Sequence, residues 1–246
     1  MPQQITTAKL HQLRLPAMAH AWTQQNADTA TISLSFDERF AMLVDAECLA
    51  RENTRRARLL REATLRISTA TVENIDYSSK RELDKAQVRQ LASGRWLAEH
   101  QNLIVTGKTG TGKTYLACAL ATAAMRQGRR VIYRRAPRLY EELAIAHADG
   151  TYPRYLAKIA RVDLFVIDDF AMAPLTAVQR ADLLEIVEDR YDRASTLIAS
   201  QLDPKSYHGY FAEPTFADAF CDRLLHNAHR LVLHGPSRRK ETASIR

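Results

Sequence analysis

Near the start of the chain, apolar residues recur at the three- and four-residue spacing of a helix, at Leu10, Leu13, Ala17 and Ala21. Pro16 interrupts this series. Because proline lacks an amide hydrogen and its ring clashes with the preceding turn, we expect two short helices here rather than one. The chain is therefore predicted to begin with helices.

A longer helix is predicted to follow. Ser35 and Glu38 have the spacing of a capping box, in which the serine side chain caps an amide three residues further on. Behind them, apolar residues mark one face of a helix: Phe36, Phe40, Leu43 and Ala50. This helix reaches roughly to Arg66, so residues 1–68 are predicted to form a small all-α N-terminal domain.

From Thr69 onward the pattern changes to short apolar runs that alternate with amphipathic segments. The apolar runs predict strands at Leu103–Thr106, Val131–Arg134, Leu164–Asp168, Thr196–Ser200 and Arg230–Leu233. The amphipathic segments predict helices near 85–93, 113–127, 137–147, 152–160, 177–193 and 216–227. Alternating strands and helices indicate a central parallel five-stranded sheet flanked by helices. Residues 69–246 are thus predicted to form an α/β domain.

The first predicted strand leads into a complete phosphate-binding loop of the pattern G-x-x-x-x-G-K-[ST]. It comprises Gly107, Lys108, Thr109, Gly110, Thr111, Gly112, Lys113 and Thr114. The glycines let successive amides point at phosphate oxygens, and the following helix adds its positive end. Lys113 is predicted to reach the β- and γ-phosphates, and the Thr114 hydroxyl is predicted to bind Mg²⁺.

Two adjacent carboxylates, Asp168 and Asp169, end the third predicted strand. A buried strand delivers such groups to the C-terminal edge of a parallel sheet, where nucleotides bind. Asp168 is predicted to hold Mg²⁺ through water, and Asp169 to orient or deprotonate the attacking water. Many ATPases of this kind carry glutamate at the second position, so the shorter aspartate bears on the hydrolysis rate rather than on binding.

Two further polar positions complete the predicted catalytic set. Either Ser200 or Gln201, at the tip of the fourth strand, is expected to position the attacking water, and Gln201 is favoured. Arg223 lies on a helix beyond that strand. We interpret it as an arginine finger that reaches the γ-phosphate of a neighbouring subunit in trans, against the alternative of a surface arginine beside Asp222.

The order of the motifs also indicates the class of nucleotide-binding protein. The strand Val131–Arg134 lies between the phosphate loop and the paired aspartates. We take this extra strand to distinguish the chain from simple nucleotide kinases, in which the Asp-bearing strand neighbours the strand before the loop. No N-K-x-D sequence for guanine is present, so ATP is expected rather than GTP.

The net charge of +7 is compatible both with a nucleic-acid partner and with a solvated basic surface. A dense run of arginines shifts the balance towards phosphate contacts: Arg51, Arg55, Arg56, Arg58, Arg61 and Arg66. A second candidate set comprises Arg134, Arg135 and Arg138, with Lys158 and Arg161 nearby in the sequence. Phosphate contacts carry little sequence preference.

Other features of the sequence narrow the class of protein. The three cysteines have no disulfide or zinc-ligand spacing, and His226 and His229 lack a third ligand. The N-terminus has no signal-peptide pattern, and no apolar run approaches the ~20 residues that span a membrane. A cytoplasmic protein without a membrane association is expected.

Several segments together resemble one family. They are Ile75-Asp76-Tyr77, Leu83-Asp84-Lys85, Leu91–Trp96, Gly107–Thr114, Ser200-Gln201-Leu202 and Asp222–Arg230. They are similar to the IstB family, the AAA+ helper ATPases of bacterial insertion sequences and close relatives of the DnaC helicase loader. The resemblance covers nearly the whole chain, and the run around Arg223 and the segment before the phosphate loop are its specific parts.

The resemblance implies an ATP- and Mg²⁺-dependent protein that assembles as an oligomer on duplex DNA, with the N-terminal helical region assisting. It implies recruitment and stimulation of a partner transposase of the IstA type, and no DNA cleavage by this chain. Arg238, Arg239 and Lys240 are candidates for a sensor or for DNA contacts. A DnaC-like loader acting on single-stranded DNA is the alternative. A small-molecule kinase would need an acceptor pocket and a lid, and the sequence shows neither.

Overall fold

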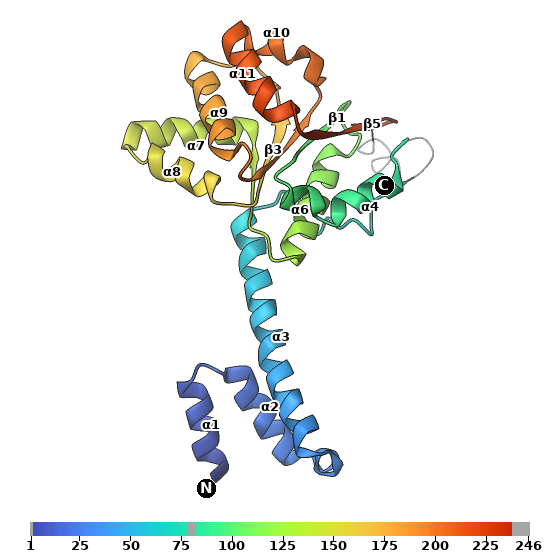
Figure 1. The fold of residues 1–246 in the computed structure, drawn as a ribbon, viewed down its shortest axis with the longest axis vertical. Helices are drawn as coiled ribbons and strands as arrows, with labels where there is room; N and C mark the ends of the chain where they lie inside the picture. The colour runs from blue at the N-terminus through green and yellow to red at the C-terminus, as the bar shows by residue number, and fades with distance from the viewer. Residues whose placement is uncertain (1, 78–81, 238–246) are drawn as a thin grey trace, which may run out of the picture. The chain divides into compact units, whose positions relative to one another are not determined.

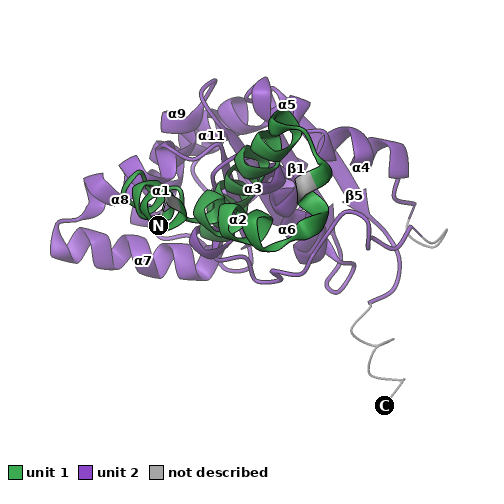
Figure 2. Ribbon diagram, turned by 90° about the horizontal axis from the view of Figure 1, so that it is seen from below, with its two compact units in different colours: residues 1–58 green, residues 59–246 purple. Residues whose placement is uncertain are grey.

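The computed structural model describes residues 2–77 and 82–237 (Figure 1). The chain divides into two compact units, residues 1–58 and 59–246 (Figure 2). The division falls inside helix α3 (Phe36–Ala63), because Leu59 and Ala63 belong to the core of the second unit. The predicted domain boundary at residue 68 lies further along the chain and stays a prediction. Among the described residues, no helix is long and apolar enough to cross a membrane.

The first unit is helical. It contains α1 (Pro2–Gln12), α2 (Pro16–Ala27), the 3-10 helix η1 (Thr29–Ser33) and most of α3. Pro16 stands in the first turn of α2, so the predicted break between two short helices is confirmed. The capping box is present as well: Ser35 Oγ accepts from the Glu38 amide at 3.3 Å, and the Glu38 carboxylate accepts from the Ser35 amide at 2.8 Å.

The predicted long helix is confirmed, but two residues of its predicted apolar face are exposed. Phe36 and Phe40 are 78% and 52% exposed, and their rings stack on each other with centroids 6.0 Å apart. Further along α3, Glu47 is buried and accepts from two amides in the first turn of α2, at 3.0 and 3.1 Å. Glu47 thus satisfies unpaired amides at the start of α2, a contact that a hydrophobic pattern does not indicate.

The second unit is built on a sheet of five parallel strands in the order β2-β3-β4-β1-β5. The strands are β1 (Asn102–Gly107), β2 (Val131–Arg135), β3 (Leu164–Phe170), β4 (Ser195–Ser200) and β5 (Ala228–Leu233). All five predicted strands are therefore confirmed. The apolar runs of β1, β3 and β4 are continuous because helices bury both faces of the sheet there.

Helices cover the two faces of this sheet (Figure 1). One face packs against α4 (Lys85–Ala92), α5 (Arg95–Ala98) and α6 (Lys113–Arg126). The other face packs against α7 (Ala136–Asp149), α8 (Tyr152–Ala160), α9 (Ala177–Arg190), α10 (Tyr207–Phe211) and α11 (Pro214–Leu225). The sequence predicted these helices except α5 and α10, which are too short to show a periodic pattern.

Strand order corrects one step of the sequence argument. Strand β4 lies between β1 and β3, so the Asp-bearing strand is not a neighbour of the strand before the phosphate loop. The expected difference from simple nucleotide kinases is therefore present. The prediction of which strand causes it is wrong. Val131–Arg134 lies in β2 at the edge of the sheet, and β4 is the inserted strand. Crossover connections can skip positions, so chain order did not give sheet order.

Candidate functional site

The phosphate loop joins β1 to α6 and depends on its glycines. Gly107 has φ of 153°, and a Cβ there would lie 2.5 Å from the Leu233 carbonyl oxygen. Gly112 has φ of 100° and forms the N-cap of α6 in the left-handed region. A side chain at either position would distort the loop, so glycine is required for the turn that directs amides towards the start of α6.

Lys113 lies in the first turn of α6 and is largely buried. Its Nζ donates to the carbonyl oxygens of Gly107 and Lys108, at 2.7 and 3.0 Å. The ammonium group is thereby held over the middle of the loop. Phosphate oxygens cradled by the loop would meet a positive charge at this position, which fits the predicted role of Lys113.

Asp168 is the point at which three elements meet. Its carboxylate is 1% exposed, and Oδ2 accepts from Thr114 Oγ1 of α6 at 2.8 Å and from the Tyr133 phenol of β2 at 2.6 Å. Burial is the main cause that raises the pKa of Tyr133, and the charge of the Asp168 carboxylate raises it further. The phenol therefore keeps its proton and donates it in the hydrogen bond to Asp168. No sequence motif marks Tyr133 as a residue of the site.

The oxygens of Thr114 and Asp168 suit a magnesium ion. Hydroxyl and carboxylate oxygens are hard donors, and Mg²⁺ takes one or two protein oxygens together with water and substrate phosphates. Over the described part of the chain, no three His, Cys, Asp or Glu residues gather as a cage for a metal. The donor set therefore fits an ion that is shared with a nucleotide.

Asp169 turns away from Asp168 at an irregularity in β3. Its φ is 55°, and the register of β3 on β4 shifts between Ile167 and Phe170. The Asp169 carboxylate accepts from Arg135 Nε at 2.7 Å and from Arg66 Nη1 at 3.3 Å. Asp169 thus faces two guanidinium groups at the entrance of the loop.

Of the two sensor candidates, only Gln201 faces the phosphate loop. Ser200 is 1% exposed, and its Oγ is used inside the fold: it donates to the Phe170 carbonyl and accepts from the Leu202 amide, both at 2.9 Å. Gln201 Oε1 accepts from Thr109 Oγ1 of the loop at 2.8 Å. This geometry favours Gln201, although its role in catalysis stays a prediction.

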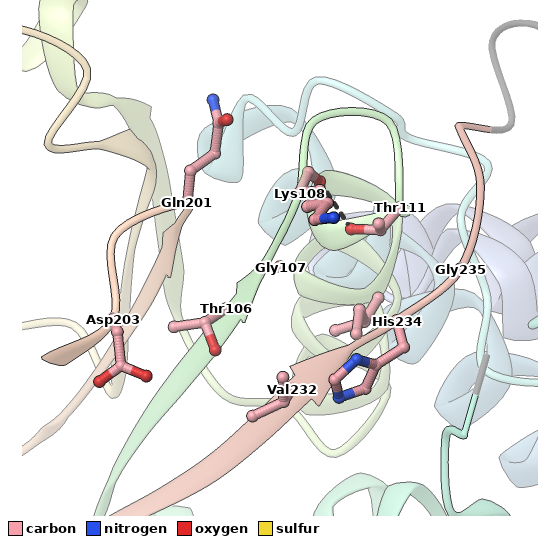
Figure 3. Close-up of a pocket in the computed structure, with 10 residues that line it drawn as sticks. Thr106, Gly107, Lys108, Thr111, Gln201, Asp203, Val232, His234 and Gly235 are labelled. Carbon is pink, nitrogen blue, oxygen red and sulfur yellow. Dashed lines mark hydrogen bonds between the residues drawn. The ribbon is translucent and has the colours of Figure 1, made fainter.

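Cavities of about 300 Å³ lie on both sides of the phosphate loop. One is lined by Arg66, Lys113, Thr114, Asp169 and Gln201 among others. Figure 3 shows residues that line the other cavity, among them Gln201 and Asp203 from the segment after β4 and His234 from the segment after β5. The two cavities share Gln201, which therefore borders the loop on both sides.

The chain beyond β5 also reaches the loop. A Cβ on Gly110 would lie 2.1 Å from Ser237 Oγ, so the segment after the last strand runs against the phosphate loop. Arg238, Arg239 and Lys240, for which a sensor or DNA-binding role was considered, lie outside the described residues.

Arg223 lies on α11 and does not line either cavity at the loop of its own chain. Its Nη2 pairs with Glu188 Oε1 of α9 at 2.9 Å, and its Nη1 donates to the Ala219 carbonyl at 3.2 Å. About a third of the side chain is exposed. A role of Arg223 in catalysis therefore requires a phosphate from another subunit, and it stays a prediction.

The arginines predicted to contact DNA fall into two sets. The guanidinium groups of the set at the end of β2 and the start of α7 each pair with a carboxylate within their own unit: Arg134 with Glu142, Arg135 with Asp169, and Arg138 with Glu141 and Glu142. The other set lies on α3: Arg51, Arg55, Arg56 and Arg58. Arg51 pairs with Glu47 at 2.8 Å, and Arg56 is exposed. DNA binding by either set stays a prediction. The ion pairs of Arg134, Arg135 and Arg138 make DNA binding by that set less favourable.

The chain matches the family model of the IstB-like ATP binding protein over residues 8–245. It is 43% identical to a Sinorhizobium fredii protein named as an insertion sequence ATP-binding protein, over 96% of each chain. It is 45% identical to a Pseudomonas fluorescens protein named as an ATP-binding protein of insertion sequence IS1162, over 82% of this chain and 87% of that protein.

A crystal structure of DnaI has the same architecture. It matches with a TM-score of 0.59 at 20% identity, over 72% of this chain and 93% of that one. This likeness concerns the fold alone. The predicted fold class, an AAA+ P-loop domain with a parallel five-stranded sheet and a helical N-terminal region, is confirmed.

Proposed function

The chain belongs to the IstB-like ATP binding protein family, and on that premise we propose that it is an ATPase that binds duplex DNA, without sequence preference, as an oligomer. In this proposal the DNA-bound assembly recruits and stimulates the transposase of its insertion sequence. The observation that carries the proposal is the convergence of Thr114 and Asp168 beside a complete phosphate loop, in a chain whose relatives are named for insertion sequences.

The nucleotide site supports binding of Mg²⁺-ATP. Loop amides and Lys113 would hold the phosphates, while Thr114 and Asp168 would hold the ion, which would supply charge neutralisation at the transferred phosphoryl group. Asp169 and Gln201 line the cavity in which the attacking water must be oriented. Hydrolysis is completed by a positive charge at the γ-phosphate, and we assign this role to Arg223 of a neighbouring subunit.

DNA binding is assigned to the arginine-rich half of α3. Its guanidinium groups are spread along a helix and suit phosphates, which position a protein without specifying a sequence. ATP acts as a switch if it binds the assembled state more tightly than the dispersed state, and hydrolysis then releases the DNA. The transposase would dock on the assembled form, so that the choice of target site would depend on where the ATP-bound assembly forms.

The test is binding to labelled random-sequence duplex and single-stranded DNA, each with a slowly hydrolysed ATP analogue and with ADP. We expect cooperative binding to the duplex that needs the analogue and weakens steeply with salt. A preference for single strands would indicate a helicase loader of the DnaC kind instead. Binding that ignores the nucleotide, or no binding, would overturn the DNA switch and leave a nucleotide-binding protein with another partner.

A further inference from the structure

A cleft of about 770 Å³ lies at the edge of the sheet beside β2. Its walls are the last turns of α3, at Leu59 and Glu62, and helix α8. It is larger than either cavity at the phosphate loop and shares no lining residue with them. The cleft is therefore a separate site, to which the proposed function assigns no role.

The floor of the cleft is apolar and includes a backbone position of the edge strand β2 that does not pair with β3. Val131, Ile132 and Val162 line it. The Leu164 amide donates to the Arg130 carbonyl at 3.1 Å, which fixes the phase of the β2–β3 ladder. Backbone groups of a parallel strand point alternately to either side, so the N–H and C=O of Val131 point away from β3 and towards the cleft.

The next outward position of β2 is Tyr133, and its carbonyl is already engaged within the fold. The Tyr133 carbonyl accepts from Arg134 Nη1 at 2.8 Å and from Thr64 Oγ1 at 3.4 Å. For Val131, in the described part of the chain, no side chain supplies an equivalent bond. The open part of the strand edge thus coincides with the cleft.

The rim of the cleft is basic. Arg154, Lys158 and Arg161 stand at three- and four-residue spacing on α8 and its end, and all three are exposed. Within residues 2–77 and 82–237, none of them has an ion pair with a carboxylate. Glu62 is the acidic residue among the described lining, against Arg154, Lys158 and Arg161. The cleft therefore presents a positive rim above an apolar floor.

We propose that this cleft binds an extended acidic segment of a partner protein, which adds to the edge of β2. An extended peptide pairs its backbone with a strand edge and places alternate side chains in the pockets beside it. Apolar side chains of the segment face Val131 and Val162, and acidic ones face Lys158 and its neighbours. Charge complementarity selects the segment and speeds its encounter with the cleft.

Duplex DNA uses these features less well than a peptide. Phosphates would meet the three cations, but a sugar–phosphate backbone has no donor and acceptor pair in the register of a strand edge. It also has no branched apolar group for a floor made of Val131, Ile132 and Val162. The peptide accounts for the floor, the strand edge and the rim together.

The experiment is a selection of random displayed peptides on the full chain, followed by affinity measurement with a labelled, enriched peptide. We expect enriched sequences in which acidic and apolar residues alternate. Lys158→Glu should weaken binding of that peptide about tenfold or more, because it turns a rim cation into an anion. The matched control Arg89→Glu changes an exposed arginine on α4, on the other face of the sheet, and should leave the affinity unchanged.

A second measurement tests the strand edge itself. Bound peptide should slow hydrogen exchange of the Val131 amide, because that N–H becomes a donor to the added strand. Neutral or basic enriched sequences, an affinity that Lys158→Glu does not change, or an unprotected Val131 would each overturn the proposal. Loss of duplex-DNA binding in Lys158→Glu without selection of acidic peptides would also overturn it and assign the rim to phosphates.

Discussion

Arg135 Nε donates to Asp169 Oδ2 across 2.7 Å, so the carboxylate assigned to the attacking water is already paired with a guanidinium group. Arg66 Nη1 approaches the same oxygen at 3.3 Å. A carboxylate held by two guanidinium groups has fewer lone pairs free to accept from the attacking water. The pair therefore bears directly on the rate of hydrolysis.

We predict that Arg135→Ala raises basal kcat for ATP, measured without DNA, while the affinity for ATP stays unchanged. Both partners are partly exposed, so the pair is worth at most about 1 kcal/mol and the increase should not exceed about fivefold. Arg129→Ala, which breaks a pair with Asp163 at the other end of β2, is the control. A fall in kcat would mean that Arg135 positions Asp169 rather than restrains it.

Tyr133→Phe should raise the Mg²⁺ concentration needed for half-maximal binding of an ATP analogue, by a few-fold. The phenol is one of two donors that fix Asp168 Oδ2, and without it the carboxylate can rotate away from Thr114. Nucleotide binding without Mg²⁺ should be unaffected. Tyr152→Phe removes a comparable bond, to Glu185 at 2.7 Å on α9, and should change neither titration.

These two relationships show what the sequence could and could not predict. The phosphate loop and Asp168 were predictable because each is a local pattern next to a strand. The partners of the aspartates were not, because they depend on the pairing of β2 with β3, which sets Arg135 beside Asp168. Arg66 and Arg135 were assigned to DNA from their charge, since a single sequence does not show which carboxylate a cation will meet.

Burial of Cys118 predicts a loss of stability at high pH. The thiol on α6 is fully buried, and burial raises its pKa from 9.0 to about 11. Between these values the unfolded chain has released the proton and the folded chain has not, so stability falls as pH rises, by about 2–3 kcal/mol in total. Urea unfolding across this range should show a steeper fall for the wild type than for Cys118→Ala. Cys48→Ala, at an exposed position, should follow the wild type.

Arg190 ties the end of α9 to α8, to the loop after α8 and to the start of β4, and Arg190→Met should lower the free energy of unfolding by about 3–5 kcal/mol. The guanidinium group is 1% exposed and donates to the carbonyls of Ile159, Val162 and Ser195. Methionine fills much of the space but leaves these buried acceptors unpaired. Denaturant unfolding measures the effect. Arg193→Met, at an exposed position, is the control, and an equal loss in both variants would contradict the role of Arg190.

Arg223→Ala should lower kcat about a thousandfold or more while ATP binding stays intact, because a finger acts only on the charge that develops at the γ-phosphate. Glu188→Gln, which removes the partner of Arg223 at 2.9 Å, should leave the finger in place and retain activity.

The decisive measurement mixes Arg223→Ala with Lys113→Ala, each inactive alone. Where the two variants adjoin, the first supplies an intact phosphate loop and the second an intact finger, so activity should return. A mixture as inactive as its components would contradict a finger in trans, since a residue that acted within its own chain could not be replaced by a neighbour.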